Sequence, residues 1–409
     1  MSIESLQKCF EESCSADLLK GMREKAWDHF LELGLPDKTD EAFRYVPLKR
    51  LYDLNLECHG PALPTRAEIL ESIYPECRES YLVFINGTFI PELSDLTALP
   101  KKVVVLPIVD AMRSYGPFLQ GRWSKILKEE LDPFAVLNLA IHPKGVFFYV
   151  PPKTSIQTPI QALYLSQGDL SVCRTHLFLA SQSEVEWVST VKGSGVHNTM
   201  LDVVLEDGAQ CKHLDVSSEG EGWHLNYLRG SLKRDSRLHH LGVTRGSRIT
   251  RHSLRATLLG ENSDALLQGI WQLGNKSQIH NHVEVQHAAP HAKSLQKFKG
   301  ILSDYAQSSF EGKIYVKPVA QKTEAYQLNN NLLLSDFAIA YAKPNLEIFA
   351  DDVKASHGAT VSQLDEDELF YLKSRGIDEL SAKKLLIEGF INEMTSQITI
   401  PSVREAAHV

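Results

Sequence analysis

From about residue 145 to residue 365 the chain consists of short β-type runs, and helix signals almost vanish. Runs rich in branched and aromatic residues, such as Val146–Val150 and residues 185–191, end at turn sequences such as Asp207-Gly208 and Gly274-Asn275. Roughly 200 residues of short strands with closely spaced turns suit a sandwich, a barrel or a β-solenoid. The strand pattern alone leaves these three architectures open.

A helical pattern precedes this strand-rich region. Apolar residues from Leu18 to Leu33 follow the spacing of one helix face, and Gly34-Leu35-Pro36 ends the pattern. Farther along, residues 81–90 predict a β-hairpin, because Asn86-Gly87 suits the two-residue turn that twists with its strands. We therefore expect a mostly helical N-terminal domain over residues 1–140, followed by a β core over residues 141–361.

Helical patterns return in the C-terminal part, residues 362–409, which we expect to form a third, helical domain. Asp365 with Glu368 resembles a capping-box start, and Gly376 fits the position just after a helix. Apolar residues then recur at helical spacing, namely Leu380, Leu385, Leu386, Phe390, Ile391 and Met394. This apolar face either packs on its own domain or docks a partner.

The composition excludes several classes of protein. Hydrophobic residues make up 43% and charged residues 23% of the 409 residues, which is typical of globular proteins and not of disordered chains. The formal net charge of −8 and the lack of a basic run argue against a nucleic-acid partner. No stretch is apolar enough to cross a membrane, and the first residues lack a signal-peptide pattern, so we expect a cytoplasmic protein.

The cysteines limit how a metal cluster could be held. All six lie within the first 211 residues, and no C-x-x-C pair is present. The C-terminal half of this chain alone therefore cannot bind a cluster through several thiolates. A metal group held there needs ligands of another kind.

One group of residues, the histidine group His280, His282, His287 and His291, could supply such ligands. Imidazole is the commonest metal ligand in proteins, and His280 and His282 would share one face of a strand. A catalytic metal site normally adds a ligand from a distant strand, and the sequence identifies none. A metal site and a set of ordinary hydrogen-bonded histidines both remain open.

A second polar block, Asp351-Asp352-Val353-Lys354-Ala355-Ser356-His357-Gly358, lies at the end of the strand-rich region. Ser356 and His357 would point to opposite faces of a strand, which disfavours a hydrolase that uses them as nucleophile and base. Asp352 and His357 could instead act as iron ligands together with a group from elsewhere. No phosphate-binding glycine loop is present, so the chain is not a recognisable nucleotide-binding enzyme.

Several further blocks follow one another between Gly260 and about Phe390: Gly260-Glu261-Asn262-Ser263, Phe310-Glu311-Gly312-Lys313-Ile314, Gln321-Lys322-Thr323, Asn331-Leu332-Leu333-Leu334 and Ser374-Arg375-Gly376-Ile377. Together with the block at residues 351–358, they resemble the SufB/SufD family of iron–sulfur cluster assembly scaffolds. The resemblance covers about a third of the chain. It implies a mainly β fold with helical ends, in which a central right-handed parallel β-helix lies between N-terminal and C-terminal helical domains.

The resemblance also implies a function and partners. It describes a non-catalytic scaffold subunit of a SufBCD-type complex, paired edge to edge with a SufB-like paralogue through the β-helix. A SufC-like ABC ATPase would dock on the C-terminal helices, which makes Leu380, Leu385, Leu386 and Phe390 candidate docking residues. The chain itself would hold no tightly bound cofactor. Iron or an iron–sulfur cluster would be bound transiently and shared with SufB.

Within the resemblance, His357 matches a family histidine at the SufB interface that takes part in iron acquisition or in building the nascent cluster. Many relatives have Cys where this chain has Ala355, so the chain would contribute an imidazole and not a thiol. A SufB-type subunit needs a cysteine near this block, and the absence of any Cys after Cys211 argues against that type. An unpaired β-helix edge also favours a homodimer when SufB is absent. A metal-dependent enzyme built on the histidine group remains the alternative from another class.

Overall fold

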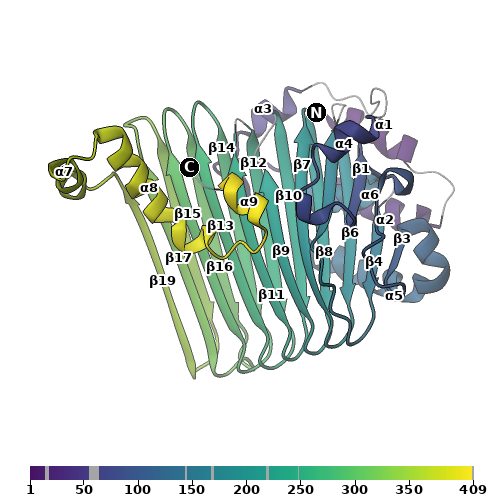
Figure 1. Ribbon diagram of the computed structural model, residues 1–409. Helices are drawn as coiled ribbons and strands as arrows, with labels where there is room; N and C mark the ends of the chain where they lie inside the picture. The colour runs from purple at the N-terminus through teal and green to yellow at the C-terminus, as the bar shows by residue number, and fades with distance from the viewer. Residues whose placement is uncertain are drawn as a thin grey trace.

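The computed structural model describes residues 1–13, 18–54, 64–142, 145–166, 170–217, 221–246 and 248–407. Its centre is a β-solenoid in which successive strands alternate between two parallel sheets (Figure 1). One sheet has ten strands in the order β19-β17-β15-β13-β11-β9-β7-β5-β1-β2, and the other has nine in the order β18-β16-β14-β12-β10-β8-β6-β4-β3. The predicted mainly β fold with a central parallel β-helix and helical ends is therefore confirmed.

The strands of the solenoid are mostly ten residues long. They are β4 (Val146–Val150), β5 (Ile160–Ser166), β6 (Leu170–Leu179), β7 (Glu184–Gly193), β8 (Val196–Leu205), β9 (Gln210–Ser217), β10 (Trp223–Leu232), β11 (Arg237–Arg245), β12 (Ile249–Leu258), β13 (Asp264–Leu273), β14 (Gln278–His287), β15 (Lys293–Leu302), β16 (Gln307–Val316), β17 (Thr323–Leu333), β18 (Ile339–Ile348) and β19 (Val353–Ser362).

Strand alternation explains why these segments form a solenoid. Along each strand, alternate side chains enter the space between the two sheets, where apolar residues such as Leu228, Leu254 and Val283 form one continuous core. Tight turns between the strands use residues with positive φ, including Asn262 and Asn275. Each strand therefore stacks in register on the strand two positions earlier in the chain, as β10 does on β8.

The predicted hairpin is confirmed and starts the ten-stranded sheet. β1 (Tyr81–Ile85) pairs antiparallel with β2 (Thr88–Phe89), and both Asn86 and Gly87 have positive φ, as the two-residue turn requires. β1 also pairs in parallel with β5. In the other sheet, β3 (Val104–Pro107) pairs antiparallel with β4. The N-terminal region thus supplies the first strands of both sheets.

Most of the N-terminal helices cover the outer face of the nine-stranded sheet at its first strands (Figure 1). The segment with Glu41 and Tyr45 reaches farther, to β18, whereas Ile69 and Cys77 pack with the ten-stranded sheet. Apolar residues of this layer, such as Phe30, Trp123 and Phe134, pack against outward-facing residues of β8 and β10, such as Met200 and Tyr227. The helices and 3-10 turns of this region are α1 (Ile3–Ser13), α2 (Lys20–Leu33), η1 (Glu41–Phe43), α3 (Leu48–Tyr52), α4 (Arg66–Leu70), η2 (Pro75–Cys77), η3 (Pro91–Leu93), α5 (Ile108–Glu129) and α6 (Pro133–Ile141).

The C-terminal helices lie on the other side of the solenoid. α7 (Glu366–Ser374) begins at Asp365, whose side chain accepts hydrogen bonds from two backbone N–H groups, and Gly376 has positive φ after the helix, as predicted. The later part of α8 (Glu379–Thr395) and α9 (Pro401–Ala407) pack on the outer face of the ten-stranded sheet. None of the described helices combines the length and apolar character of a membrane span.

Candidate functional site

The last turn of the solenoid is open. Within the part of the chain that the structure describes, β18 pairs with β16 alone and β19 with β17 alone. No residue of β18 or β19 is fully buried, whereas β10 in the middle is buried along nearly its whole length. Both sheets therefore end in edge strands with backbone groups that a further strand can pair with.

His357 lies in the middle of β19 and is exposed. Val353 and Ala355 pack against an apolar cluster between the two sheets, and residues two positions apart share a face of a strand. His357 therefore belongs to the face of β19 that continues the solenoid interior at its open end. Ser356 belongs to the opposite face, which confirms that the two side chains are not arranged as a nucleophile and base.

The strand register places His357 at the end of a row of polar residues. His357 pairs with Gln327 of β17, which pairs with Gln296 of β15, and the Gln327 amide donates to Gln296 over 3.2 Å. Through one leucine the row continues to His240 and His213, whose Nδ1 atoms lie 3.0 Å apart. His357 is thus the exposed last member of a row whose earlier histidines are buried.

Burial fixes the earlier histidines of this interior in their neutral form. Removal from water lowers the pKa of His213 to about 3 and that of His252 to about 4. The same effect raises the pKa of the Asp215 carboxyl to about 7, and Asn226 bridges this carboxyl to His252. Deep inside the solenoid, these polar residues serve as hydrogen-bonded structural groups.

Asp352 lies at the turn just before β19. Its backbone N–H donates to the Gln321 side chain over 2.9 Å, and its carbonyl accepts from Lys322. The turn borders a cleft of about 480 Å³ that also contains Lys293. Five residues of extended chain span roughly 16 Å, so Asp352 and His357 are too far apart to coordinate one ion directly.

Apolar side chains surround the open end. Phe337 is 62% exposed and Val361 47% exposed, and Ile339 and Tyr341 on β18 are each 38% exposed. Tyr341 also stacks on Tyr45 of the N-terminal region, with ring centroids 4.1 Å apart. Exposed aromatic and branched residues beside two unpaired strand edges are typical of a surface that another protein covers.

Comparison with models of known protein families shows which family the chain belongs to. Residues 163–390 match the model described as SUF system FeS cluster assembly, SufBD core domain, and residues 4–162 match the SufBD protein N-terminal region. The chain belongs to the SufBD family. The resemblance found in the sequence is therefore confirmed at the level of the family.

Individual relatives agree with this membership. The chain is 30% identical to an iron–sulfur cluster assembly SufBD family protein of Synechocystis, over 95% of this chain and 89% of the relative. It is 28% identical to the iron–sulfur cluster assembly protein SufD of Escherichia coli, over 90% of this chain and 86% of the relative. It is 22% identical to SufB of Bacillus subtilis, over 79% and 72%.

In this SufBD family protein the four members of the histidine group have separate hydrogen-bond or ionic partners. His280 is buried and contacts Ser309 at 2.9 Å, His282 contacts Glu311 at 3.4 Å, and His287 contacts Ser294 at 2.8 Å. His291 lies on an exposed turn, 3.9 Å from Glu261. The described residues contain no group of three or more His, Cys, Asp or Glu side chains placed around one ion. Metal binding by this group stays a prediction.

The predicted docking residues of the C-terminal helices differ in exposure. Leu380 is 80% exposed and Leu385 48% exposed, whereas Leu386 and Phe390 are half-buried. Phe390 lies against Lys299 of the solenoid, whose ammonium is 4.9 Å from the ring centroid. Phe370 and Tyr371 of α7 add further exposed aromatic surface. The start of α8 and α7 thus present an apolar surface beyond the sheet (Figure 1).

Sequence reasoning missed a set of buried ion pairs that join the N-terminal helices to the solenoid. Arg229 donates to both carboxylate oxygens of Glu130, at 2.7 and 3.2 Å, and Arg251 donates to Asp132 at 2.6 Å. Burial opposes ionisation of Glu130, but Arg229 and Arg255 outweigh it and lower its pKa to about 2. The available signal was charged residues at outward positions of strands that are otherwise apolar.

Proposed function

We propose that this protein is a scaffold subunit for iron–sulfur cluster assembly that works by joining its open solenoid end to a SufB-type subunit. In this proposal the chain has no catalytic activity of its own. Iron or a nascent cluster is the cargo, bound transiently between the two subunits. The observation that carries the proposal is the exposed end of the solenoid, where His357 is the accessible member of a row of otherwise buried polar residues.

Edge pairing explains why a SufB-type subunit fits this surface. A strand added to β18 or β19 satisfies backbone groups that otherwise face water, and Ile339 and Val361 supply apolar area around them. A paralogue with the same solenoid presents a matching edge. The same logic gives a homodimer when the SufB-type subunit is absent, because identical edges can pair about a two-fold axis.

His357 is the proposed ligand at this junction. An imidazole nitrogen binds iron well, and the chain has no cysteine at the neighbouring Ala355. Further ligands would come from the partner, because the described residues place no group of three or more His, Cys, Asp or Glu side chains around one ion at His357. Asp352 has a separate position at the turn, and we propose no more for it than a secondary role in attracting iron.

Anaerobic cluster reconstitution tests the role of His357. The wild-type chain and His357→Ala are co-purified with the SufB-type subunit and the SufC-type ATPase, and iron and sulfide bound to the complex are then measured. We expect the variant complex to assemble with unchanged stoichiometry and to bind much less cluster. Ser356→Ala, on the opposite face of β19, is the matched control and should reconstitute normally. Equal reconstitution of both variants would remove the ligand role.

The apolar surface of α7 and the start of α8 is the proposed docking site for the SufC-type ATPase. Leu380 and Leu385 are the exposed anchors, while the later turns of α8 are occupied by contacts with the solenoid. We expect Leu380→Glu with Leu385→Glu to weaken ATPase binding at least tenfold, as for loss of a central apolar contact. Binding of the SufB-type subunit should not change, and unaltered ATPase binding would exclude this surface.

A further inference from the structure

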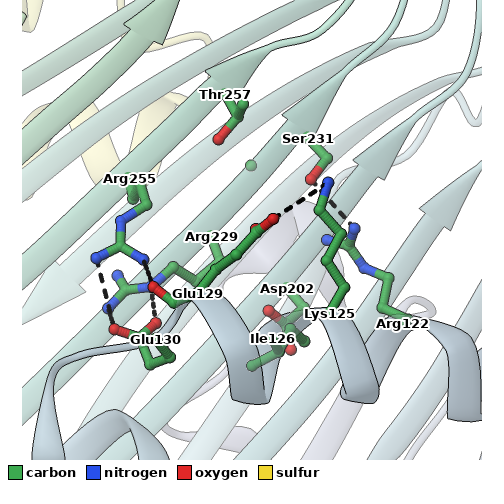
Figure 2. Close-up of a pocket in the computed structure, with 11 residues that line it drawn as sticks. Arg122, Lys125, Ile126, Glu129, Glu130, Asp202, Arg229, Ser231, Arg255 and Thr257 are labelled. Atoms are coloured by element: carbon green, nitrogen blue, oxygen red, sulfur yellow. Dashed lines mark hydrogen bonds and ion pairs between the residues drawn. The ribbon is translucent and has the colours of Figure 1, made fainter. Parts of the chain in front are cut away.

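A small cavity on the outer face of the nine-stranded sheet has a charge pattern that the proposed function leaves unexplained. It lies between α5 and strands β10 and β12 and has a volume of about 50 Å³ (Figure 2). A single buried water needs roughly 10–15 Å³ on the same kind of measure, so the cavity has room for a few heavy atoms. In the nine-stranded sheet, strands β14 and β16 separate it from β18 (Figure 1).

Almost every charge around this cavity is matched by an opposite charge. Glu130 is shared by Arg229 at 2.7 Å and Arg255 at 3.5 Å. Glu129 lies 3.9 Å from Lys125. Asp202 also borders the cavity, and it is paired on its other side with Arg174, at 2.6 Å, and with His176, at 3.3 Å.

Arg122 is the exception. Its side chain is half-buried, and its Nε is buried with no hydrogen-bond partner among the described residues. Asp202 and Glu129 act on its charge, but no carboxylate of the described residues lies within ion-pair distance of it. Within the described ranges, its guanidinium donates one hydrogen bond, from Nη1 to the hydroxyl of Ser231, over 3.1 Å. A half-buried guanidinium with a buried N–H group that has no acceptor is stabilised when an anion or further acceptors compensate it.

The floor of the cavity supplies further donors next to Arg122. Ser231 of β10 and Thr257 of β12 are direct neighbours across the sheet. Figure 2 shows the Arg122 guanidinium directed toward Ser231, with Thr257 farther from Arg122 than Ser231 is. The Lys125 and Glu129 side chains reach into the same space from α5. A planar guanidinium beside hydroxyl donors and an ammonium is a recurrent arrangement for binding a tetrahedral oxyanion.

We propose that this cavity binds a small inorganic oxyanion of the phosphate or sulfate type, with Arg122 as its principal ligand. Ser231 and Thr257 donate hydrogen bonds from the sheet, and Lys125 contributes its charge from α5. The bound anion would compensate the unmatched guanidinium and connect α5 to strands β10 and β12. The site would therefore strengthen the attachment of the N-terminal helical layer.

Isothermal titration of the full chain with inorganic phosphate, and separately with sulfate, tests this site. Potassium chloride at equal ionic strength controls for salt effects. We expect saturable binding of one anion and a rise in melting temperature that chloride does not reproduce. A charge-assisted hydrogen bond of roughly 1.5–3 kcal/mol corresponds to a loss of at least tenfold in affinity for Arg122→Gln. Arg122→Lys should retain part of the affinity.

Two further variants keep the test decisive. Arg113→Gln removes an exposed arginine of the same helix and should leave anion binding unchanged. Thr257→Val removes a hydroxyl without touching a charge, so it reports on the site even if Arg122→Gln unfolds. We expect it to weaken phosphate binding by roughly two- to tenfold. Absence of binding beyond the chloride control, or equal affinity in the wild type and in both Arg122→Gln and Thr257→Val, would overturn the proposal.

Discussion

The covered part and the open end of the solenoid have the same strand architecture, but they differ in their exposure to solvent. From the first turns to β10 in the middle of the nine-stranded sheet, helices cover the outer face, and charged residues such as Arg229 and Glu130 are paired. At the last turn, β18 and β19 contain no fully buried residue, and most residues of β19 are exposed. In one row of the ten-stranded sheet, His213 and His240 are buried among other residues, whereas His357 faces solvent. Within this row, position along the solenoid thus decides whether a histidine is buried or accessible.

This difference explains how a fold of repeated turns can present one accessible histidine, His357, at its last turn. Each interior turn is covered by the turn before it and the turn after it, so its polar residues find partners within the chain. The last turn lacks a following turn. We infer that a second subunit covers the last turn. The earlier turns need no such subunit, because the groups that cover them belong to the same chain.

The largest expected effect is in the covered part of the solenoid, at β10. Arg229→Ala leaves the buried carboxylate of Glu130 without its main partner, and breaking a buried ion pair in this way costs roughly 3–5 kcal/mol. Denaturant unfolding should show a loss of that size. Arg237→Ala, on the exposed side of β11, is the control and should change the free energy of unfolding by less than about 0.5 kcal/mol. If Arg229→Ala changed the free energy of unfolding by a similarly small amount, the buried ion pair would not stabilise the covered part of the solenoid as described.

At the open end we expect the opposite result. Val361→Lys places a charge among the exposed apolar residues of β19, where it hinders pairing with another strand. Binding to the SufB-type subunit should weaken at least tenfold, or about 1.4 kcal/mol. The free energy of unfolding of the isolated monomer should stay within about 0.5 kcal/mol of wild type. If Val361→Lys bound the SufB-type subunit with wild-type affinity in a titration by light scattering or calorimetry, the open end would not be the pairing surface.

The pH dependence of stability sharpens the contrast for the buried histidines. The folded state lowers the pKa of His213 from 6.5 to about 3, so its contribution is complete above pH 6.5 and is lost as the pH falls toward 3. The slope is at most about 1.4 kcal/mol per pH unit for each such histidine. Asp215 works in the opposite sense, because its raised pKa removes stability as the pH rises from 3.8 to about 7.

Unfolding of His213→Gln between pH 7 and pH 4 measures this contribution. The variant should lose stability less steeply than wild type as the pH falls. Val191→Ala, a buried apolar truncation nearby, should lower the free energy of unfolding by a similar amount at each pH. If His213→Gln and wild type have parallel pH profiles, the buried histidine does not titrate as described.

Local sequence signals predicted the local structures well. The Asn86-Gly87 turn and the Asp365 and Gly376 positions depend on chemistry within a few residues, and all three were found as expected. The strand-rich region was also visible in the sequence. The choice of a solenoid over a sandwich or barrel needed the family resemblance, because the pairing of β10 with β8 and β12 is a contact between distant residues.

The buried ion pairs and the row of polar residues inside the solenoid could not be predicted from local sequence signals. Arg229 and Glu130 are 99 positions apart, and charged residues in isolation are normally assigned to the surface. A period was nevertheless present, because His213 and His240 are 27 positions apart and occupy equivalent places in successive turns. The spacing then changes, because the later members of the row, Leu267, Gln296, Gln327 and His357, follow at intervals of 27, 29, 31 and 30 residues. A repeat of fixed length therefore does not extend from His213 to His357.

Amide hydrogen exchange at the open end tests the central claim most directly. The isolated chain, diluted until it is monomeric, is compared with its complex with the SufB-type subunit. We predict that exchange slows at least tenfold in β18 or β19 on binding, while buried β10 is unaffected, since the partner pairs with the last strands. Unchanged exchange in both β18 and β19 within an intact complex would contradict completion of the solenoid by a partner.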